Sequence, residues 1–208
     1  MTSYLLAQKI ADDASADNVV SGKTPYMVSS IRKVLVDGEP REKMELCTSG
    51  YGASSPRIVY SKDENDFSLA GVQGGDLVQI NVDEQNTVRA LKVLWKNGST
   101  SFADGTKEYS TDTSWSAQCR IKMAYAYSIR TDVLDAVSVD VTPDNVPYDA
   151  KMPLYMPEAK ILKYDDRLNT VVELTAAEIK DYENFGDKRS TFIYYMWYQG
   201  VRAIFMID

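Results

Sequence analysis

Apolar and polar residues alternate along much of this chain with a period of two, the pattern of half-buried β-strands. The clearest example covers residues 120–130. One face of it carries Ile121, Met123, Tyr125, Tyr127 and Ile129. The other face carries Arg120, Lys122, Ala124, Ala126, Ser128 and Arg130. We therefore expect a long strand in which Tyr125 and Tyr127 point into a core while Lys122 and Arg130 face water.

Less regular alternation predicts ten further strands, at residues 4–11, 27–36, 42–47, 77–82, 88–95, 133–139, 160–164, 171–174, 191–198 and 201–207. Short polar segments separate many of them, namely Asp37-Gly38, 83–86, 165–169 and Gln199-Gly200. Such residues supply the positive φ angles or the side-chain hydrogen bonds that hairpin turns need. The chain is thus expected to be all-β.

One segment departs from the strand pattern. Thr175 is followed three residues later by Glu178, the spacing of a capping box at a helix start. Ile179 and Tyr182 place apolar groups on one side, and Gly186 is a natural stop. We expect a helix of about two turns here, centred on residues 176–181, as the only substantial helix.

The segment 97–117 is rich in Ser, Thr, Gly and Asp and shows little periodicity. We place a linker or long loop at 99–117, between a first module at 1–98 and a second at 118–208. In each module, three strands are followed by a short helix or turn and then by a final hairpin. That order is typical of the OB-fold and of other small five-stranded barrels. The expected fold is all-β with minor α content, as two five-stranded, barrel-like modules.

Charge and composition exclude some classes of function. The 208 residues carry a net charge of −7, with Lys and Arg interleaved among acidic residues, so no basic footprint for nucleic acid exists. No apolar run approaches the roughly 20 residues that cross a bilayer, and we expect no membrane insertion. The first residues lack a signal-peptide pattern, which leaves open a cytoplasmic protein or a piece of a longer secreted one.

A resemblance to a known family rests on short motifs. Residues 75–88, GDLVQINVDEQNTV, follow a plan of Gly-Asp, apolar strand, turn and apolar strand. The segments AYAY at 124–127, KILKYD at 160–165 and AEIKDY at 177–182 follow in the same order before the last hairpin. This arrangement resembles β-rich regions of clostridial surface proteins that carry S-layer homology domains. Insertions at 13–24 and 50–56 depart from it.

The resemblance implies an extracellular, cell-surface location and a fragment of a longer secreted protein. In that family the wall anchor is a separate set of S-layer homology repeats, so this chain would be the displayed part. The implied partners are cell-wall glycan or another surface protein. The family implies no catalytic residues.

The residues themselves offer little for catalysis. Histidine is absent, which removes Ser-His-Asp and Cys-His mechanisms and histidine-ligated metals. Cys47 and Cys119 are too few for a structural zinc site, and whether they pair stays open. The acidic loops 63–66 and 165–166 do not match the spacing of a calcium loop. We expect no cofactor and no metal, and Asp and Glu that serve turns and solvation.

Aromatic residues are the remaining candidates for a functional role. The last hairpin carries Phe192, Tyr194, Tyr195, Trp197, Tyr198 and Phe205. One face must fill the core, and the other needs a cover such as the neighbouring module, a partner chain or a sugar ring. Tyr195, Trp197 and Tyr198 are therefore the candidate binding residues.

Three functions from different classes follow. The favoured one is a non-catalytic structural or display module of a bacterial cell-surface, S-layer-associated protein. The alternative is a carbohydrate- or protein-binding module that uses exposed aromatic residues. A carboxylate-dependent hydrolase, with an Asp/Glu pair in a cleft, is the third.

Overall fold

The structure, a computed structural model, describes residues 24–49, 56–110, 119–197 and 200–207. Within these residues strands dominate and form two sheets, and the helices are single turns. The prediction of an all-β chain is confirmed. No helix of the described residues is both long enough and apolar enough to cross a bilayer.

The described chain divides into two compact units. The first contains residues 24–48, 56–97 and the hairpin tip Tyr164–Val171. The second contains Ser49, Gly98–Lys163 and the described part of Val172–Asp208.

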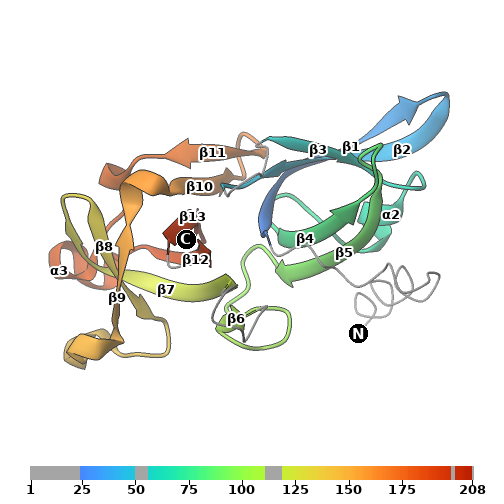
Figure 1. The fold of residues 1–208 in the computed structure, drawn as a ribbon. Helices are drawn as coiled ribbons and strands as arrows, with labels where there is room; N and C mark the ends of the chain where they lie inside the picture. Colours follow the sequence, from blue (N-terminus) through green and yellow to red (C-terminus); the bar gives the residue numbers. More distant parts are fainter. Residues whose placement is uncertain (1–23, 50–55, 111–118, 198–199, 208) are drawn as a thin grey trace. The chain divides into compact units, whose positions relative to one another are not determined.

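The first unit is built on a five-stranded sheet (Figure 1). Its elements are β1 (Tyr26–Val36), β2 (Glu39–Cys47), β3 (Arg57–Tyr60), α2 (Asp66–Leu69), β4 (Leu77–Val82) and β5 (Val88–Trp95). The strand order is β3-β2-β1-β4-β5, and neighbouring strands are antiparallel. Tyr60 of β3 forms an isolated parallel bridge with Thr87, the residue that precedes β5.

Turn chemistry explains the hairpins of this unit. Asp37 and Gly38, between β1 and β2, both have positive φ, at 53° and 85°. Asn86, before β5, has a φ of 59°. Asn and Asp tolerate this left-handed conformation better than other non-glycine residues, as the sequence predicted. The predicted strand at 4–11 lies outside the described residues, and β3 is a strand that the alternation did not indicate.

The core of the first unit lies between this sheet and α2. Buried residues from four strands and from the helix region form it: Tyr26, Val28, Met44, Leu46, Val59, Phe67, Ala70, Val72, Val78 and Ile80. Phe67 is the buried residue of α2, whose single turn would not be stable without such packing.

The second sheet has eight strands (Figure 1). They are β6 (Glu108–Ser110), β7 (Cys119–Arg130), β8 (Val133–Ser138), β9 (Lys151–Tyr155), β10 (Lys160–Asp165), β11 (Thr170–Leu174), β12 (Thr191–Trp197) and β13 (Gly200–Met206). The order is β11-β10-β13-β12-β7-β8-β9, with β6 paired to β7. Only β10 and β13, among the pairs of the described strands, run parallel.

This count differs from the five strands expected in the second module and from the six that the alternation predicts between residues 120 and 207. The alternation missed β6, which has three residues, and β9, which has five and contains Pro153. Segments this short carry too few residues for a period to show, and proline is typical of an edge strand such as β9.

Strand β7 is covered on both faces, which corrects the expectation of one solvent face. Tyr125 is 2% exposed, as predicted, but Ala124, Ala126 and Ser128 are buried as well. Arg130 faces water as predicted, whereas Tyr127 and Lys122 are half-buried. A bulge in the pairing with β8 lies between Ala126 and Ser128. A bulge shifts the alternation by one residue.

The bulge explains on which face of β7 the side chains after Ala126 lie. Ala124, Ala126 and, after the bulge, Ile129 all pack on one core. Tyr127 is the extra residue in the pairing and leaves the buried side. This core also contains Leu134, Leu154, Ile161, Ile179, Phe192, Tyr194 and Ile204.

The predicted two-turn helix is divided into separate short turns. A 3-10 turn, η5 (Ala176–Glu178), opens with the predicted capping box. The Thr175 N–H donates to Glu178 Oε2 at 2.8 Å. The chain then becomes extended at Ile179, with φ −80° and ψ 126°, because this side chain is buried in the core.

A second turn, α3 (Tyr182–Phe185), begins after Asp181 and ends at Gly186, whose φ is 57°. Gly186 is thus the stop that the sequence predicted, although the turn it ends is a different one. The 3-10 turns η2 (Pro143–Asn145), η3 (Tyr148–Ala150), η4 (Met156–Glu158) and η6 (Gly186–Lys188) add to the minor helical content.

Candidate functional site

The three candidate binding residues of the last hairpin occupy different environments. Tyr195 is 2% exposed, packed within the sheet between β7 and β13, so it offers no ring to solvent. Trp197 is half-buried at the end of β12. Tyr198 lies outside the described residues. Of the two described candidates, Tyr195 is therefore buried in the sheet, and Trp197 keeps part of its surface exposed.

A different group of aromatic residues gathers beside β7. We call Tyr125, Tyr127, Tyr182, Lys151 and Arg189 the tyrosine–cation cluster. The Tyr127 and Tyr182 rings stack with centroids 5.9 Å apart. The Lys151 Nζ lies 3.9 Å from the Tyr127 centroid. The Arg189 guanidinium carbon lies 4.6 Å from the Tyr125 centroid and 5.6 Å from that of Tyr182.

Several elements of the second unit bring the cluster together. Tyr125 and Tyr127 come from β7, which contacts α3, and Tyr182 is the first residue of α3 (Figure 1). Lys151 begins β9. Arg189 precedes β12 and is held in place by its neighbour, because Ser190 O accepts from the Ala126 N–H and Ser190 N–H donates to Lys180 O.

Asp181 anchors α3 in this arrangement. Its carboxylate accepts from the Asn184 N–H at 2.8 Å, which caps the turn, and from the Ile129 N–H of β7 at 3.1 Å. Ile129 lies beyond Tyr125, the last β7 residue paired with β12, so β12 offers its N–H no acceptor and Asp181 satisfies it. Tyr127, the extra residue of the β7 bulge, stacks on Tyr182.

Two buried polar atoms of the cluster have no hydrogen-bond partner among the described residues. They are the Tyr125 hydroxyl oxygen and the Arg189 Nε. An unsatisfied buried polar group costs about 1–3 kcal/mol. Most such groups in folded proteins are paired or meet water or a ligand.

Charges of both signs lie around the cluster. Arg189 Nη1 pairs with Asp187 Oδ1 at 3.3 Å, and the Tyr182 hydroxyl donates to Asp144 Oδ1 at 2.7 Å. The Lys151 ammonium contacts the Tyr127 ring. Two cations and two carboxylates therefore meet at the cluster.

These surroundings raise the pKa values of two tyrosines of the cluster. Burial raises the pKa of Tyr125, and the Arg189 guanidinium opposes that rise. The hydrogen bond to Asp144 raises the pKa of Tyr182, with a smaller contribution from burial. Both phenols therefore remain protonated at neutral pH and can donate hydrogen bonds.

The most buried carboxylates accept hydrogen bonds that stabilise the fold. Asp76 accepts from the N–H groups of Gln73 and Asn97 and from the Lys96 ammonium at 2.7 Å. Asp135 accepts from the Ser128 hydroxyl and from Arg130. Together with Asp181, these side chains close turns and strand ends.

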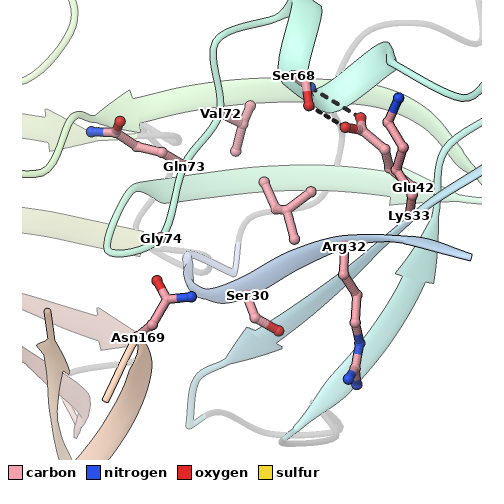
Figure 2. A pocket seen from close by; sticks show the side chains of 10 residues that line it. Ser30, Arg32, Lys33, Glu42, Ser68, Val72, Gln73, Gly74 and Asn169 are labelled. Carbon is pink, nitrogen blue, oxygen red and sulfur yellow. Dashed lines mark hydrogen bonds between the residues drawn. The ribbon is translucent and has the colours of Figure 1, made fainter. Parts of the chain in front are cut away.

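A polar hollow of about 330 Å³ lies in the first unit. Figure 2 shows side chains from β1, β2, α2 and the segment before β4 around it, including Lys33 and Gln73. Glu42 is the buried acid there, 2% exposed, and it accepts from the N–H groups of Phe67 and Ser68 at 2.7 and 3.0 Å. Arg32 pairs with Glu45. The buried charge of the hollow is thus already used to hold α2.

The two acidic loops considered for calcium are also used in turns. Asp66 accepts from the Asp63 N–H, and Asp165 accepts from the N–H groups of Arg167 and Leu168. In the described part of the chain, no three His, Cys, Asp or Glu side chains gather as metal ligands would.

The sequence analysis did not propose Tyr182, Lys151 or Arg189 as binding residues, and it named Tyr182 only as an apolar residue of the predicted helix. They lie far apart along the chain, and only the fold brings them to Tyr125 and Tyr127. The two tyrosines of the 124–127 segment were the one local indication of this cluster in the sequence. Comparisons with protein-family models, curated proteins and solved structures gave no match to this chain.

Proposed function

We propose that this chain is a non-catalytic structural or display module of a bacterial cell-surface, S-layer-associated protein. The observation that carries the proposal is the use of the buried carboxylates. A catalytic acid or base must exchange its proton with a substrate. Glu42, Asp76, Asp135 and Asp181 instead accept hydrogen bonds from their own backbone and neighbouring side chains.

The first unit supports a finer proposal about fold. We infer that it is an OB-like barrel, because the strand order β3-β2-β1-β4-β5, a helix between β3 and β4, and a parallel bridge from β3 to the start of β5 follow that plan. Such closure removes exposed strand edges, which suits a protein displayed at high density.

The location and partners rest on the family resemblance. Residues 75–88, which carry its main motif, correspond to the β4–β5 hairpin. In this proposal the chain is the displayed part of a longer secreted protein, and its partners are cell-wall glycan or another surface protein.

A binding module is the second candidate function. The observation that favours it is the tyrosine–cation cluster, which combines aromatic rings, two cations and unpaired buried polar atoms. In this candidate function Tyr125, Tyr127 and Tyr182 supply the aromatic contacts, and the role of Trp197 and Tyr198 stays a prediction.

Antibody labelling of intact and permeabilised cells of the native host tests the surface proposal. We expect equal labelling of both preparations, with a cytoplasmic enzyme labelled only after permeabilisation as the control. Labelling of this protein that requires permeabilisation would contradict the proposed location.

A further inference from the structure

We propose that two copies of this chain associate through the free edge of β1, with the two β1 strands antiparallel to each other. The inference goes beyond the structural role proposed above and does not depend on the cell-surface location. It rests on the strand pairing and the charges within the first unit.

The outer half of β1 has a neighbouring strand on one side only. Strand β2 pairs with β1 as far as Val36, whereas β4 pairs with it only at Tyr26 and Met27. The β1–β2 hairpin therefore extends past β4 (Figure 1). Beside residues 30–33 lies the polar hollow described above, and no described strand pairs with β1 there (Figure 2).

This free edge carries unpaired backbone groups. The turn after Val36 connects it to Glu39, its partner in β2, so Val36 uses its hydrogen bonds within the hairpin. Successive residues of an antiparallel strand direct these groups to opposite sides. The N–H and C=O groups of Ile31, Lys33 and Leu35 therefore point away from β2, and none of them has a hydrogen-bond partner among the described residues.

The end of this edge is apolar. Leu35 is 75% exposed, and its neighbours Val34 and Val36 are half-buried. An exposed apolar edge with free N–H and C=O groups is a template for the addition of another strand. A strand added there would satisfy the backbone groups and cover the Leu35 side chain.

The positive charges restrict how two copies can pair. A twofold axis at Arg32 or at Lys33 would place that cation opposite itself, which is destabilising. An axis at Val34 instead places Lys33 opposite Leu35 of the second copy, and Arg32 opposite Val36. In this register the free groups of Lys33 and Leu35 form hydrogen-bonded pairs across the axis.

Glu39 supplies the complementary negative charge. It lies beside Val36, on the same face as Arg32, and forms no ion pair among the described residues. Arg32 shares Glu45 with Lys43, at 2.6 and 2.9 Å. Within one copy Arg32 and Glu39 are separated by about 13 Å along the hairpin. Across the axis only Val36 separates them, a distance that two extended side chains span, so the chain carries both charges that the interface needs.

Sedimentation equilibrium of the full chain, at concentrations up to about 1 mM, tests the proposal. We expect a monomer–dimer equilibrium that Leu35→Pro weakens at least tenfold. Proline removes the outward N–H of Leu35 and leaves the bonds between β1 and β2 in place. A chain that stays monomeric at every concentration would overturn the proposal.

Leu35→Lys separates edge pairing from other modes of association. It should weaken the dimer roughly tenfold, because an apolar side chain is no longer buried. Leu69→Lys is the matched control, since Leu69 is 62% exposed on α2, and its dimer should equal that of the parent. A dimer that neither Leu35 variant weakens would form through another surface and would contradict the proposal.

A charge exchange tests the register. Arg32→Glu alone and Glu39→Lys alone should each weaken the dimer roughly fivefold or more, because like charges then meet at both ends of the interface. An equal mixture of the two variants should form heterodimers, since each contact again joins opposite charges. A mixture that associates no better than either variant alone would overturn the proposed pairing.

Discussion

The guanidinium of Arg189 lies over the ring of Tyr125, with 4.6 Å between the guanidinium carbon and the ring centroid. This contact joins the segment before β12 to β7 in the second unit. It places a cation beside a phenol whose hydroxyl is buried and has no hydrogen-bond partner among the described residues. The pKa of Tyr125 is therefore set by two opposing influences, burial and the cation.

Removing the cation should shift that balance. In Arg189→Gln we expect the pKa of Tyr125, already raised by burial, to rise further because the one opposing positive charge is lost. The change can be followed by NMR titration of ring-labelled tyrosine. Lys160→Gln serves as the control for loss of a positive charge elsewhere. A fall in the pKa of Tyr125 would show that the guanidinium does not face this phenol.

Tyr194 makes the fold sensitive to alkaline pH. Burial raises its pKa to about 12, above the unfolded value of about 10. Because the folded state holds this proton more tightly, its contribution to stability is complete below pH 10 and is lost as pH rises to 12. The loss amounts to about 2–3 kcal/mol. Urea unfolding at pH 8 and pH 11.5 should show it.

The matched variant for this effect is Tyr194→Phe. It lacks the titrating group, so its stability should fall less between the same two pH values. Equal losses of unfolding free energy in the parent and in Tyr194→Phe would show that other groups cause the alkaline unfolding.

Asp181 should matter more for stability than its neighbour Asp187. Asp181→Ala leaves the N–H groups of Asn184 and Ile129 without their acceptor, which should cost about 2–4 kcal/mol. The Asp187 side chain is 98% exposed, and Asp187→Ala should change the free energy of unfolding by less than about 0.5 kcal/mol. Urea melts give both values, and equal effects would contradict the anchoring role of Asp181.

Tyr125 should behave as a core residue despite its polar head. Tyr125→Ala removes a 2%-exposed ring and should cost about 3–5 kcal/mol of unfolding free energy. Tyr127→Ala is the comparison, because Tyr127 is the bulge residue and its ring is only half-buried, so its loss should cost less. A loss below about 1 kcal/mol in Tyr125→Ala would mean that the buried packing of β7 is wrong.

Local chemistry made much of the fold predictable. The boundaries of β4 and β5 agree with the alternation at 77–82 and 88–95, and Asp37 and Asn86 adopt the positive φ expected of them. Gly186 ends a helical turn as predicted. In each case the signal lies within a few residues, where side-chain period or backbone sterics act directly.

The remaining features depend on contacts between distant residues. The hydrogen bond from the Ile129 N–H to Asp181 joins residues 52 positions apart, and no residue near Ala126 predicts the β7 bulge. Ile179 interrupts the predicted helix because its side chain is buried in the core. The tyrosine–cation cluster needs β7, α3, β9 and the segment before β12 at once, so a search for local motifs passed over it.

The central proposal is that the buried carboxylates of this chain stabilise its fold and do not catalyse hydrolysis of a substrate. The most direct measurement incubates the purified full chain with isolated cell-wall glycan and peptide material and follows the products by mass spectrometry. The account predicts no product above the buffer control. Release of a product that a single Asp or Glu substitution abolishes, in a variant that keeps its unfolding midpoint, would contradict it.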